Sequence, residues 1–474
     1  MPCRVTLTQL AEVIAAQPPL NLSDASLASL FTGITTDTRS LKPGEVFVAL
    51  RGEKFDGHEF VSVAIEKGAL AAIVDFRFDI SKSKIQKYEL SYGAGTEALP
   101  LLQVEDTLQA YQKIASWWRK QFTIPVIAVT GSVGKTTTKE LIAAVLATQG
   151  NVLKTQANYN NEIGVPKTLL ELGQEHDYAV IEMAMRAPGE IALLTQLARP
   201  TIGAIVNVGT AHIGRLGSEE AIAKAKCELL AEMSPTGVAI LNHDNSRLIA
   251  TAATVWQGQT LTYGLEGGDL QGKLLDNGQL QESPLLDVEG VQLPLPLPGR
   301  HNASNFMAAL AVAKILQIDW SPLTAGLALD LPAGRSQRYE LPNDVVILDE
   351  TYNAGLESMV ASLQLLAQTQ GLRHIAVLGS MKELGERSLK FHQRVGNTAR
   401  QLNLDALLIL VDGADAEALA VGADGIPTEC FSSHASLVKR LKEFVQPGDR
   451  LLFKASHSVG LDRVVNQFRA EFSC

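Results

Sequence analysis

The stretch from Val126 to Leu146 constrains the fold of this chain more than any other part of its sequence. The β-branched run Val126–Val129 predicts a short buried strand. A glycine turn follows, and the residues from Lys139 onward are good helix formers with apolar side chains at helical spacing. A strand that passes through a glycine turn into a helix presents backbone N–H groups and the positive end of the helix dipole to an anion. We therefore predict a phosphate-binding site in this turn.

The turn carries the tail of the general phosphate-loop motif G-x-x-x-x-G-K-[ST]. Val129 stands at the place of the first glycine of that motif. In such loops the lysine reaches the β- and γ-phosphates and the hydroxyl group ligates Mg²⁺. A plain glycine turn with a surface lysine is the alternative, which the flanking strand and helix disfavour. We predict that a nucleoside triphosphate contacts Gly131, Ser132, Val133, Gly134, Lys135, Thr136 and Thr137.

Chain length and composition limit the class of protein. A chain of 474 residues is too long for one ordinary hydrophobic core, so two or three domains are expected. The net charge of −10, without a basic block, argues against a nucleic-acid binder. The four cysteines form no C-x-x-C pair, which disfavours a zinc site or a disulfide framework. The N-terminus lacks the apolar core of a signal peptide, and no apolar run reaches the length of a membrane span. We expect a cytoplasmic protein with no transmembrane segment.

The order of the predicted elements indicates an α/β protein of three domains. Residues 1–104 form a small α/β domain, whose first helix is predicted to begin with a capping box of Thr6 and Gln9. Residues 80–98 are loop-like, and residues 105–122 are predicted to be a connecting helix. Residues 123–333 and 334–474 each alternate strand and helix, which predicts a parallel sheet in the central domain and a doubly wound C-terminal domain.

Individual strands of the two larger domains are visible in the sequence. Residues 257–297 alternate apolar and polar side chains around the turn Asp276-Asn277-Gly278, which predicts an antiparallel insertion or edge. The predicted strands elsewhere are Tyr178–Glu182, Ile202–Asn207, Val238–Asn242, Val345–Leu348, His374–Leu378, Ala406–Val411 and Arg450–Phe453.

Several polar side chains lie where the central sheet would bring them to the phosphate loop. Glu182 ends a predicted strand, the place where Mg²⁺ ligands lie in nucleotide-binding sheets, although an exposed acid is the alternative. His212 follows a strand and a glycine turn, and a lone histidine there is usually structural. Lys226 lies on a helix whose default interpretation is a solvated face. Asn302 and Asn305 are spaced to share one face of a helix, where amides can cap the helix or bind a base.

Taken together, these stretches resemble the Mur ligase family, the ATP-dependent amide-forming enzymes of peptidoglycan precursor synthesis. The sequence Thr-Gly-Ser-Val-Gly-Lys-Thr-Thr at 130–137 is similar to that family's version of the phosphate loop, which explains the missing first glycine. The resemblance spans all three domains. It implies a uridine-nucleotide domain at the N-terminus, a central ATPase domain and a Rossmann-like C-terminal domain that closes on ATP.

The resemblance also assigns roles to particular residues. It implies that Thr136 and Glu182 hold one Mg²⁺ and that His212 and Lys226 belong to a second. In several family members a lysine at the place of Lys226 is carbamylated, which turns a cation into an oxygen ligand. Lys135, His212 and Lys226 are the implied catalytic residues. Further ATP contacts are implied for Asn302, Asn305, Arg335 and Asp349. The implied substrate-binding residues are Thr36, Asp37, Thr38, Arg39, Asp56, His58, Asn160, Asn161, Tyr352, Asn353, Lys454 and Ser456.

The stretches Asn158–Pro166, Tyr352–Ala354 and Val377–Gly385 resemble the family members that add D-alanyl-D-alanine, and this resemblance implies the substrates UDP-N-acetylmuramoyl-tripeptide and D-alanyl-D-alanine. The family resemblance also implies an acyl-phosphate intermediate and a monomeric enzyme. Glu350, Gly355, Ser380 and His457 depart from the family's usual residues, which bears on the dipeptide pocket. The alternatives are a diamino-acid-adding Mur ligase, a folylpolyglutamate synthase-like ligase, a phosphate-loop regulatory ATPase and a protein that only binds a nucleotide-sugar.

Overall fold

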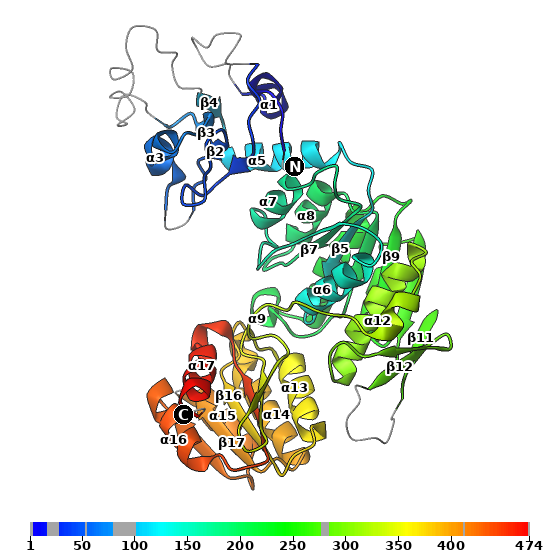
Figure 1. Cartoon of the computed structure of the whole chain (residues 1–474), viewed down its shortest axis with the longest axis vertical. Coiled ribbons are helices and arrows are strands. Elements are labelled where there is room, and N and C mark those ends of the chain that lie inside the picture. The colour runs from blue at the N-terminus through cyan, green and yellow to red at the C-terminus, as the bar shows by residue number, and fades with distance from the viewer. Residues whose placement is uncertain are drawn as a thin grey trace.

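The computed structural model describes residues 3–16, 28–52, 55–78, 101–275, 284–410 and 413–472. The chain forms three successive bodies, with the N-terminal and C-terminal ones at opposite ends of an elongated molecule (Figure 1). The fold is therefore α/β in three domains, as predicted. The predicted loop at 80–98 and the predicted turn at 276–278 lie outside the described residues.

The N-terminal domain is built on a parallel sheet in the order β1-β2-β3-β4. The predicted capping box opens α1, where Thr6 Oγ1 accepts from Gln9 N and Gln9 Oε1 accepts from Thr6 N. The elements are α1 (Leu7–Ile14), β1 (Ile34–Thr35), β2 (Val46–Val48), η1 (Gly57–Phe60), α3 (Val61–Glu66), β3 (Ala71–Asp75) and β4 (Leu101–Val104).

A helix, α5 (Thr107–Arg119), connects this domain to the central one. The sequence predicted a helix here, and the structure ends it at Arg119, three residues before the predicted end. Arg119 Nη1 donates to Phe122 O at 2.6 Å and its Nε donates to Ala198 O at 3.0 Å. Trp118 Nε1 donates to Leu172 O at 3.0 Å. These bonds attach α5 to the central domain.

The central domain contains a nine-stranded sheet in the order β13-β12-β11-β10-β9-β8-β5-β7-β6. Its strands are β5 (Val126–Thr130), β6 (Val152–Lys154), β7 (Tyr178–Glu182), β8 (Ile202–Ile205), β9 (Val238–Asn242), β10 (Gln259–Gly264), β11 (Leu270–Leu275), β12 (Leu285–Val288) and β13 (Val291–Pro294). The antiparallel prediction for 257–297 is right for β11–β13 and wrong for β10, which pairs with β9 in parallel. Alternating apolar and polar side chains indicate a half-buried strand, but they do not indicate whether it runs parallel or antiparallel to its neighbour.

Helices cover both faces of the central sheet. Successive side chains of a strand point to opposite faces, so each buried strand packs against helices on both sides. Ile127 and Val129 of β5 pack into a core with α6 and α12, whereas Val126 and Ala128 pack toward α7, α8 and α10. The helices are α6 (Lys135–Leu146), α7 (Gly164–Leu170), α8 (Glu190–Ala198), α9 (Ile213–Leu216), α10 (Glu219–Glu232), α11 (Ser246–Ala252), α12 (Arg300–Ile315) and η3 (Ser321–Ala325).

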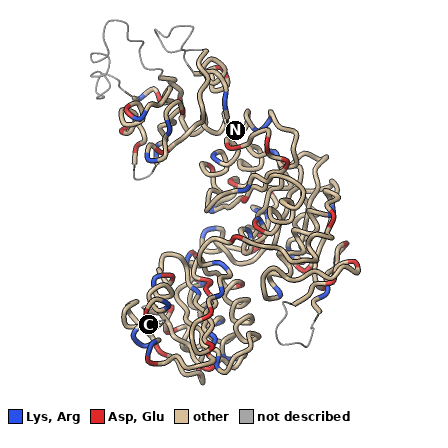
Figure 2. Tube along the Cα trace, viewed as in Figure 1, with Lys and Arg blue, Asp and Glu red and all other residues tan. Residues whose placement is uncertain are grey.

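The C-terminal domain has a six-stranded sheet in the order β14-β15-β19-β16-β17-β18, antiparallel only at β14. The predicted strands are confirmed within the described residues. The elements are β14 (Gln337–Leu341), β15 (Val345–Asp349), α13 (Leu356–Gln368), β16 (Arg373–Gly379), η4 (Gly385–Arg387), α14 (Ser388–Gln401), β17 (Ala406–Leu410), α15 (Ala414–Gly422), β18 (Thr428–Phe431), α16 (His434–Phe444), β19 (Asp449–Lys454), η5 (His457–Val459) and α17 (Leu461–Phe472). Acidic and basic residues are interspersed along all three domains (Figure 2).

Candidate active site

The phosphate loop lies at the carboxyl end of β5, which is flanked by β8 and β7 in the central sheet. Gly134 adopts a φ of 82°, in the left-handed region, and α6 begins at the next residue. A Cβ on Gly134 would lie 2.7 Å from Asn305 Oδ1, so only glycine fits here. The first N–H groups of α6 have no intrahelical partner and are directed toward the loop. The predicted strand, turn and helix are therefore present, and they form an anion site.

Lys135 is folded over this loop. Its Nζ donates to Gly131 O at 2.8 Å and to Ser132 O at 3.2 Å. Burial lowers the pKa of Lys135, the Glu182 carboxylate partly offsets this, and the Arg335 cation lowers it further. The lysine is thus held at the loop, where its charge interacts with the Glu182 carboxylate and with an arginine of the C-terminal domain.

Glu182 ends β7, the strand beside β5, and its side chain is buried. Asn160 Nδ2 donates to Glu182 Oε1 at 2.8 Å. Glu182 Oε2 is buried without a hydrogen-bond partner. A buried carboxylate oxygen with no partner is costly unless a cation completes its environment, and an oxygen donor suits Mg²⁺. The residues present therefore fit this ion.

His212 and Lys226 approach the same loop from the next strand connection. His212 has a φ of 64° and Lys226 is buried within α10. Burial and the Lys135 cation lower the pKa of His212, and the same two causes lower the pKa of Lys226 well below its ordinary value. A lysine with a depressed pKa has a neutral, nucleophilic amine available. The default interpretation of Lys226 as a solvated residue is wrong, whereas Lys224, two residues earlier, is exposed.

Three or more His, Cys, Asp or Glu side chains do not gather into a metal-binding group anywhere in the part of the chain that the structure describes. Mg²⁺ keeps several waters and is typically bound by one or two carboxylates together with substrate phosphates. A site with Glu182, the Thr136 hydroxyl and nucleotide phosphates is consistent with that preference.

Asn302 and Asn305 lie on the first turns of α12, next to the phosphate loop. Thr138 Oγ1 donates to Asn305 Oδ1 at 3.2 Å, and Asn305 Nδ2 donates to Asn302 Oδ1 at 3.3 Å. Asn302 Nδ2 donates to Pro298 O at 2.8 Å. The structure thus brings the predicted amide pair to the loop, with its polar groups bonded within the protein.

The C-terminal domain presents a second group of predicted residues. The Arg335 guanidinium stacks 3.7 Å from the centre of the Tyr352 ring, and its Nε is buried without a partner. Lys454 Nζ donates to Asn353 O at 3.1 Å, and burial lowers the pKa of Lys454. Ser456 Oγ accepts from Lys382 N at 3.0 Å.

Asp349 is buried at the end of β15. Its Oδ1 accepts from Thr351 N at 3.0 Å and from Thr351 Oγ1 at 2.6 Å. Burial raises the pKa of Asp349, although the Thr351 bonds act in the opposite direction. The predicted ATP contact of Asp349 stays a prediction.

Two acidic residues to which the sequence assigned no role of their own connect the central and C-terminal domains. Glu357 of α13 accepts from Thr210 N at 2.7 Å and from Thr210 Oγ1 at 3.1 Å. Glu383, which lies in the stretch Val377–Gly385, pairs with His212 Nδ1 and with Arg215. A Cβ on Gly209 would lie 2.7 Å from Glu357 Cδ, so the glycine makes room for this contact. For Glu357 that glycine was the only signal in the sequence.

The predicted uridine-side residues lie in the N-terminal domain. The side chains of Asp37 and Arg39 form a bidentate pair, with Nη2 to Oδ2 at 2.7 Å. The hydrogen bond from Arg39 lowers the pKa of Asp37 to about 2, and Lys167 of α7 contributes to this shift. The turn that holds Thr36 and Thr38 therefore faces the central domain. Asn161 Oδ1 accepts from Ile163 N and Gly164 N at the start of α7.

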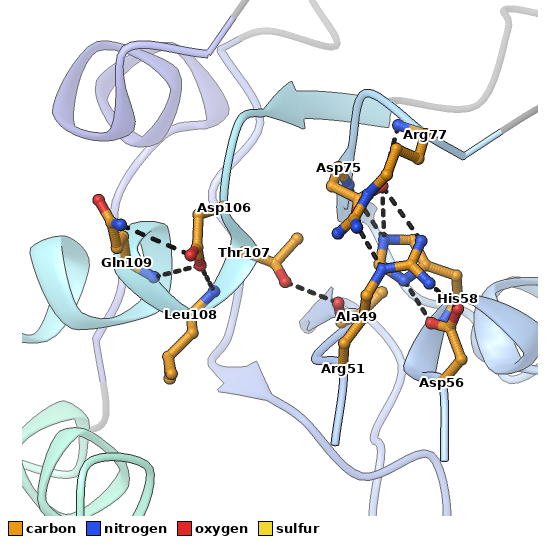
Figure 3. A network of polar contacts seen from close by, with 10 residues as sticks. All are labelled: Ala49, Arg51, Asp56, His58, Asp75, Arg77, Asp106, Thr107, Leu108 and Gln109. Atoms are coloured by element: carbon orange, nitrogen blue, oxygen red, sulfur yellow. Dashed lines mark hydrogen bonds and ion pairs between the residues drawn. The ribbon is translucent and has the colours of Figure 1, made fainter. Parts of the chain in front are cut away.

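Asp56 and His58 belong to a polar network that also contains Arg51, Asp75 and Arg77 (Figure 3). His58 Nδ1 bonds Asp56 Oδ1 at 2.6 Å, and His58 Nε2 accepts from Asp75 N at 3.0 Å. Both ring nitrogens of His58 are thus used inside the domain, and its predicted contact with substrate stays a prediction. Arg51 pairs with Asp56 and Asp75, and Arg77 Nη2 donates to Asp75 Oδ2 at 2.7 Å.

We expect Asp75 to make the N-terminal domain sensitive to acid. Burial alone would raise the pKa of Asp75, but the bonds from Arg51 and Arg77 outweigh it and hold this pKa well below its ordinary range. A depressed folded-state pKa stabilises the domain above the unfolded pKa of about 3.9, and this stability is lost as the pH falls toward the folded value. At pH 7 Asp75→Asn should therefore cost about 1.5–3 kcal/mol.

Thermal unfolding of the two proteins between pH 3 and pH 7 would measure this effect. The gap between their midpoints should be constant above about pH 5 and should narrow below about pH 4. A difference between the two midpoints that does not change with pH would contradict the depressed pKa of Asp75 as the cause of the acid sensitivity. Asp424→Asn, at an exposed position after α15 of the C-terminal domain, is the control, and its gap should not change with pH.

Comparisons with known proteins identify a family and several similar sequences. Profiles described as the Mur ligase family catalytic domain, the Mur ligase middle domain, and the Mur ligase glutamate ligase domain match residues 30–117, 129–313 and 334–457. The UDP-N-acetylmuramoyl-tripeptide–D-alanyl-D-alanine ligase of Synechocystis is 56% identical over 95% of both chains. The ligase of the same name from Escherichia coli is 36% identical over 99% of both.

Solved structures of proteins with related names are similar to this chain over nearly its whole length. MurF from Acinetobacter baumannii superposes with a TM-score of 0.84 at 30% identity, covering 99% of each chain. MurF ligase from Thermotoga maritima in complex with ADP has a TM-score of 0.79 at 30% identity, covering 95% of this chain and 99% of that one.

Proposed function

The chain belongs to the Mur ligase family, and from that premise we infer that it is an ATP-dependent ligase that joins D-alanyl-D-alanine to UDP-N-acetylmuramoyl-tripeptide. The product is the pentapeptide precursor of peptidoglycan. The observation that carries this inference is 56% identity, over 95% of both chains, to a ligase of that name. The site supplies the matching chemistry, because Lys135 lies at an anion-binding loop with the buried carboxylate of Glu182 nearby.

The reaction that suits this site is activation of a carboxylate by phosphoryl transfer. The terminal carboxylate of the tripeptide attacks the γ-phosphate of ATP, which gives an acyl phosphate and ADP. The amine of D-alanyl-D-alanine then attacks the acyl carbon, and phosphate leaves from the tetrahedral intermediate. Lys135 neutralises negative charge on the transferring group, and the N–H groups at the start of α6 orient the phosphates.

We propose that Mg²⁺ assists this reaction. Glu182 and Thr136 would hold one ion, and His212 and Lys226 would belong to the site of a second. When bound, the ions neutralise charge on the phosphates. A free lysine cation is a poor metal ligand, so we propose that Lys226 is carbamylated. Its buried, low-pKa amine supports this proposal.

His212 Nδ1 is bonded to Glu383 in the present conformation, which leaves Nε2 as the ring nitrogen that could join a metal site. We propose that the C-terminal domain moves when ATP binds. The movement would direct Arg335 at ATP, and the buried Nε of Arg335 without a partner supports that role. Closure would also exclude water, which would otherwise hydrolyse the acyl phosphate.

The substrate-side residues complete the proposal. Thr36–Arg39, Asp56 and His58 would serve the uridine nucleotide, and Asn160 and Asn161 would lie near the peptide. Tyr352, Asn353, Lys454 and Ser456 would line the dipeptide side, where Lys454 Nζ donates to Asn353 O and the Tyr352 ring lies against His457. No helix in the described part of the chain is long and apolar enough to cross a membrane. We propose a cytoplasmic monomer, since ATP and nucleotide substrates are supplied there.

Structures of related ligases that use other substrates share this fold, but they are less similar to this chain. The UDP-N-acetylmuramoyl-L-alanyl-D-glutamate–2,6-diaminopimelate ligase structure has 18% identity and a TM-score of 0.51. A folylpolyglutamate synthase from Mycobacterium tuberculosis has 16% identity and a TM-score of 0.57. These likenesses show the fold alone.

The deciding experiment is ATP-dependent phosphate release by the purified protein with one component omitted at a time. We expect release only when UDP-N-acetylmuramoyl-tripeptide, D-alanyl-D-alanine and Mg²⁺ are all present, with the pentapeptide product seen by mass spectrometry. Release with a dipeptide nucleotide and one diamino acid, or with a folate and glutamate, would overturn the substrate assignment. Release with ATP alone would favour a regulatory ATPase.

A further inference from the structure

Asn207 lies at the end of the segment that continues β8, and its side chain is bonded to the phosphate loop. Its Oδ1 accepts from Ser132 N at 3.1 Å and from Val133 N at 3.0 Å. Its Nδ2 donates to Val133 O at 2.9 Å. The backbone oxygen of Asn207 also accepts from Ser132 N at 3.1 Å. One side chain therefore bonds both polar groups of the Val133 backbone and the N–H of its neighbour.

The segment that carries Asn207 is itself held firmly. Val206 N donates to Thr130 O at 2.9 Å, and Gly209 N donates to Ser132 Oγ at 2.8 Å. On its other side, Asn242 Nδ2 donates to Val206 O and Asn245 Nδ2 donates to Val208 O, each at 3.0 Å. The amide of Asn207 thus projects from a backbone that is anchored to β5 and to the β9 side of the sheet.

The phosphate loop of this chain needs such support. Val129 replaces the first glycine of the general motif, so this loop differs from the general phosphate loop at that position. The loop also packs closely on its neighbour, since a Cβ on Gly131 would lie 3.1 Å from Val206 Cβ. With Ser132 N and Val133 N bonded to Asn207, the N–H groups at the start of α6 are among those that remain for phosphate.

We propose that Asn207 is a positioning residue for ATP, which holds the turn at Ser132 and Val133 so that Lys135 and the start of α6 face the phosphates. This proposal rests on the proposed function, because it requires ATP at the loop. Only a carboxamide can do this with one side chain, because the turn offers N–H donors and a carbonyl acceptor together.

Asn207→Asp tests the proposal with almost no change in shape. The carboxylate keeps the acceptors for Ser132 N and Val133 N, but it loses the bond to Val133 O and places a negative charge against that carbonyl and beside the phosphates. We expect KM for ATP to rise at least tenfold, with KM for the uridine nucleotide within twofold of wild type. Calorimetric titration with ADP should show a matching loss of affinity without turnover.

Asn245→Asp is the matched control. It also removes one Nδ2 bond to a carbonyl of the same segment, and it keeps an Oδ1 acceptor, for Leu248 N at 3.0 Å. It touches no residue of the phosphate loop, so KM for ATP should stay within twofold of wild type. If Asn207→Asp does not fold, Asn207→Ser, with one acceptor and one donor on a shorter arm, should show an intermediate loss.

The outcomes separate this proposal from the function on which it rests. Wild-type KM for ATP and wild-type ADP affinity in the Asn207 variants would overturn it. A lowered KM for ATP would also overturn it, because it would mean that Asn207 occupies the anion site and must leave. A wild-type protein that neither binds ADP nor releases phosphate from ATP would instead overturn the proposed function.

Discussion

Lys135→Met is expected to reduce ATP-dependent phosphate release about 10²–10³-fold, the range found when one electrostatic stabiliser of a transition state is removed. The ammonium group lies on the loop carbonyls of Gly131 and Ser132, so it is already placed where the phosphates bind. Methionine retains the length and the apolar packing of the side chain but carries no charge. Steady-state rates at saturating ATP would measure the loss in kcat.

Stability should fall far less than activity in this variant, because removal of a desolvated charge offsets the lost bonds to Gly131 O and Ser132 O. Burial lowers the pKa of Lys135, which shows that the protein pays a desolvation cost for the charge, and methionine removes that cost. Binding of the uridine nucleotide should be retained, because its predicted site lies in another domain. Lys314→Met, which breaks only a surface pair with Glu289, should keep wild-type rates. Retained turnover in Lys135→Met would overturn the phosphate-loop assignment.

Lys139 provides an informative contrast on the same helix. It is fully buried, whereas Lys135 is half-buried, and its Nζ donates to Thr155 O at 2.6 Å and pairs with Glu140 at 2.9 Å. Replacing it with methionine leaves Glu140 and Thr155 without this partner, so that variant should lose stability. The two lysines of α6 thus separate a functional charge from a structural one.

Glu182→Gln is expected to lower the rate by a similar factor of about 10²–10³, and to weaken the binding of Mg²⁺. The amide retains the length of the side chain and an acceptor for Asn160 Nδ2, but it supplies a poorer ligand for a divalent cation. A titration with Mg²⁺ at fixed ATP should show a much higher half-saturating concentration for the variant.

The stability of Glu182→Gln distinguishes a metal ligand from a structural carboxylate. Oε2 of Glu182 is buried without a hydrogen-bond partner, so removal of its charge should leave the unfolding midpoint unchanged or raise it. Addition of Mg²⁺ should raise the midpoint of the wild type more than that of the variant. A variant with the wild-type response to Mg²⁺ would show that Glu182 does not ligate the ion.

Local features of the sequence were sufficient to predict most elements. The run Val126–Val129, the glycine turn and the helix beyond it were visible because strand propensity, glycine conformation and helical periodicity act over a few residues. The capping box of Thr6 and Gln9 is equally local. The direction of β10 was not predictable, because alternation of side chains is the same in parallel and antiparallel strands.

The composition of the site depended on the order of strands in the sheet. β8, β5 and β7 are neighbours although they are not consecutive in the chain. That arrangement brings Asn207 and Glu182 to opposite sides of the phosphate loop. The resemblance to a family supplied roles for Glu182 and Lys226, but neither residue stood out by its local sequence from an exposed acid or a surface lysine.

The sequence by itself determined the elements, the three-domain organisation and the phosphate loop, because each depends on interactions between residues close together in the chain. Only the tertiary structure decided that Lys226 is buried while Lys224 is exposed, and that Asn207 bonds the loop. It also decided that Glu357 and Glu383 meet Thr210 and His212, across 147 and 171 residues of chain. Contacts over such separations depend on how whole domains pack, and no local pattern of residues encodes them.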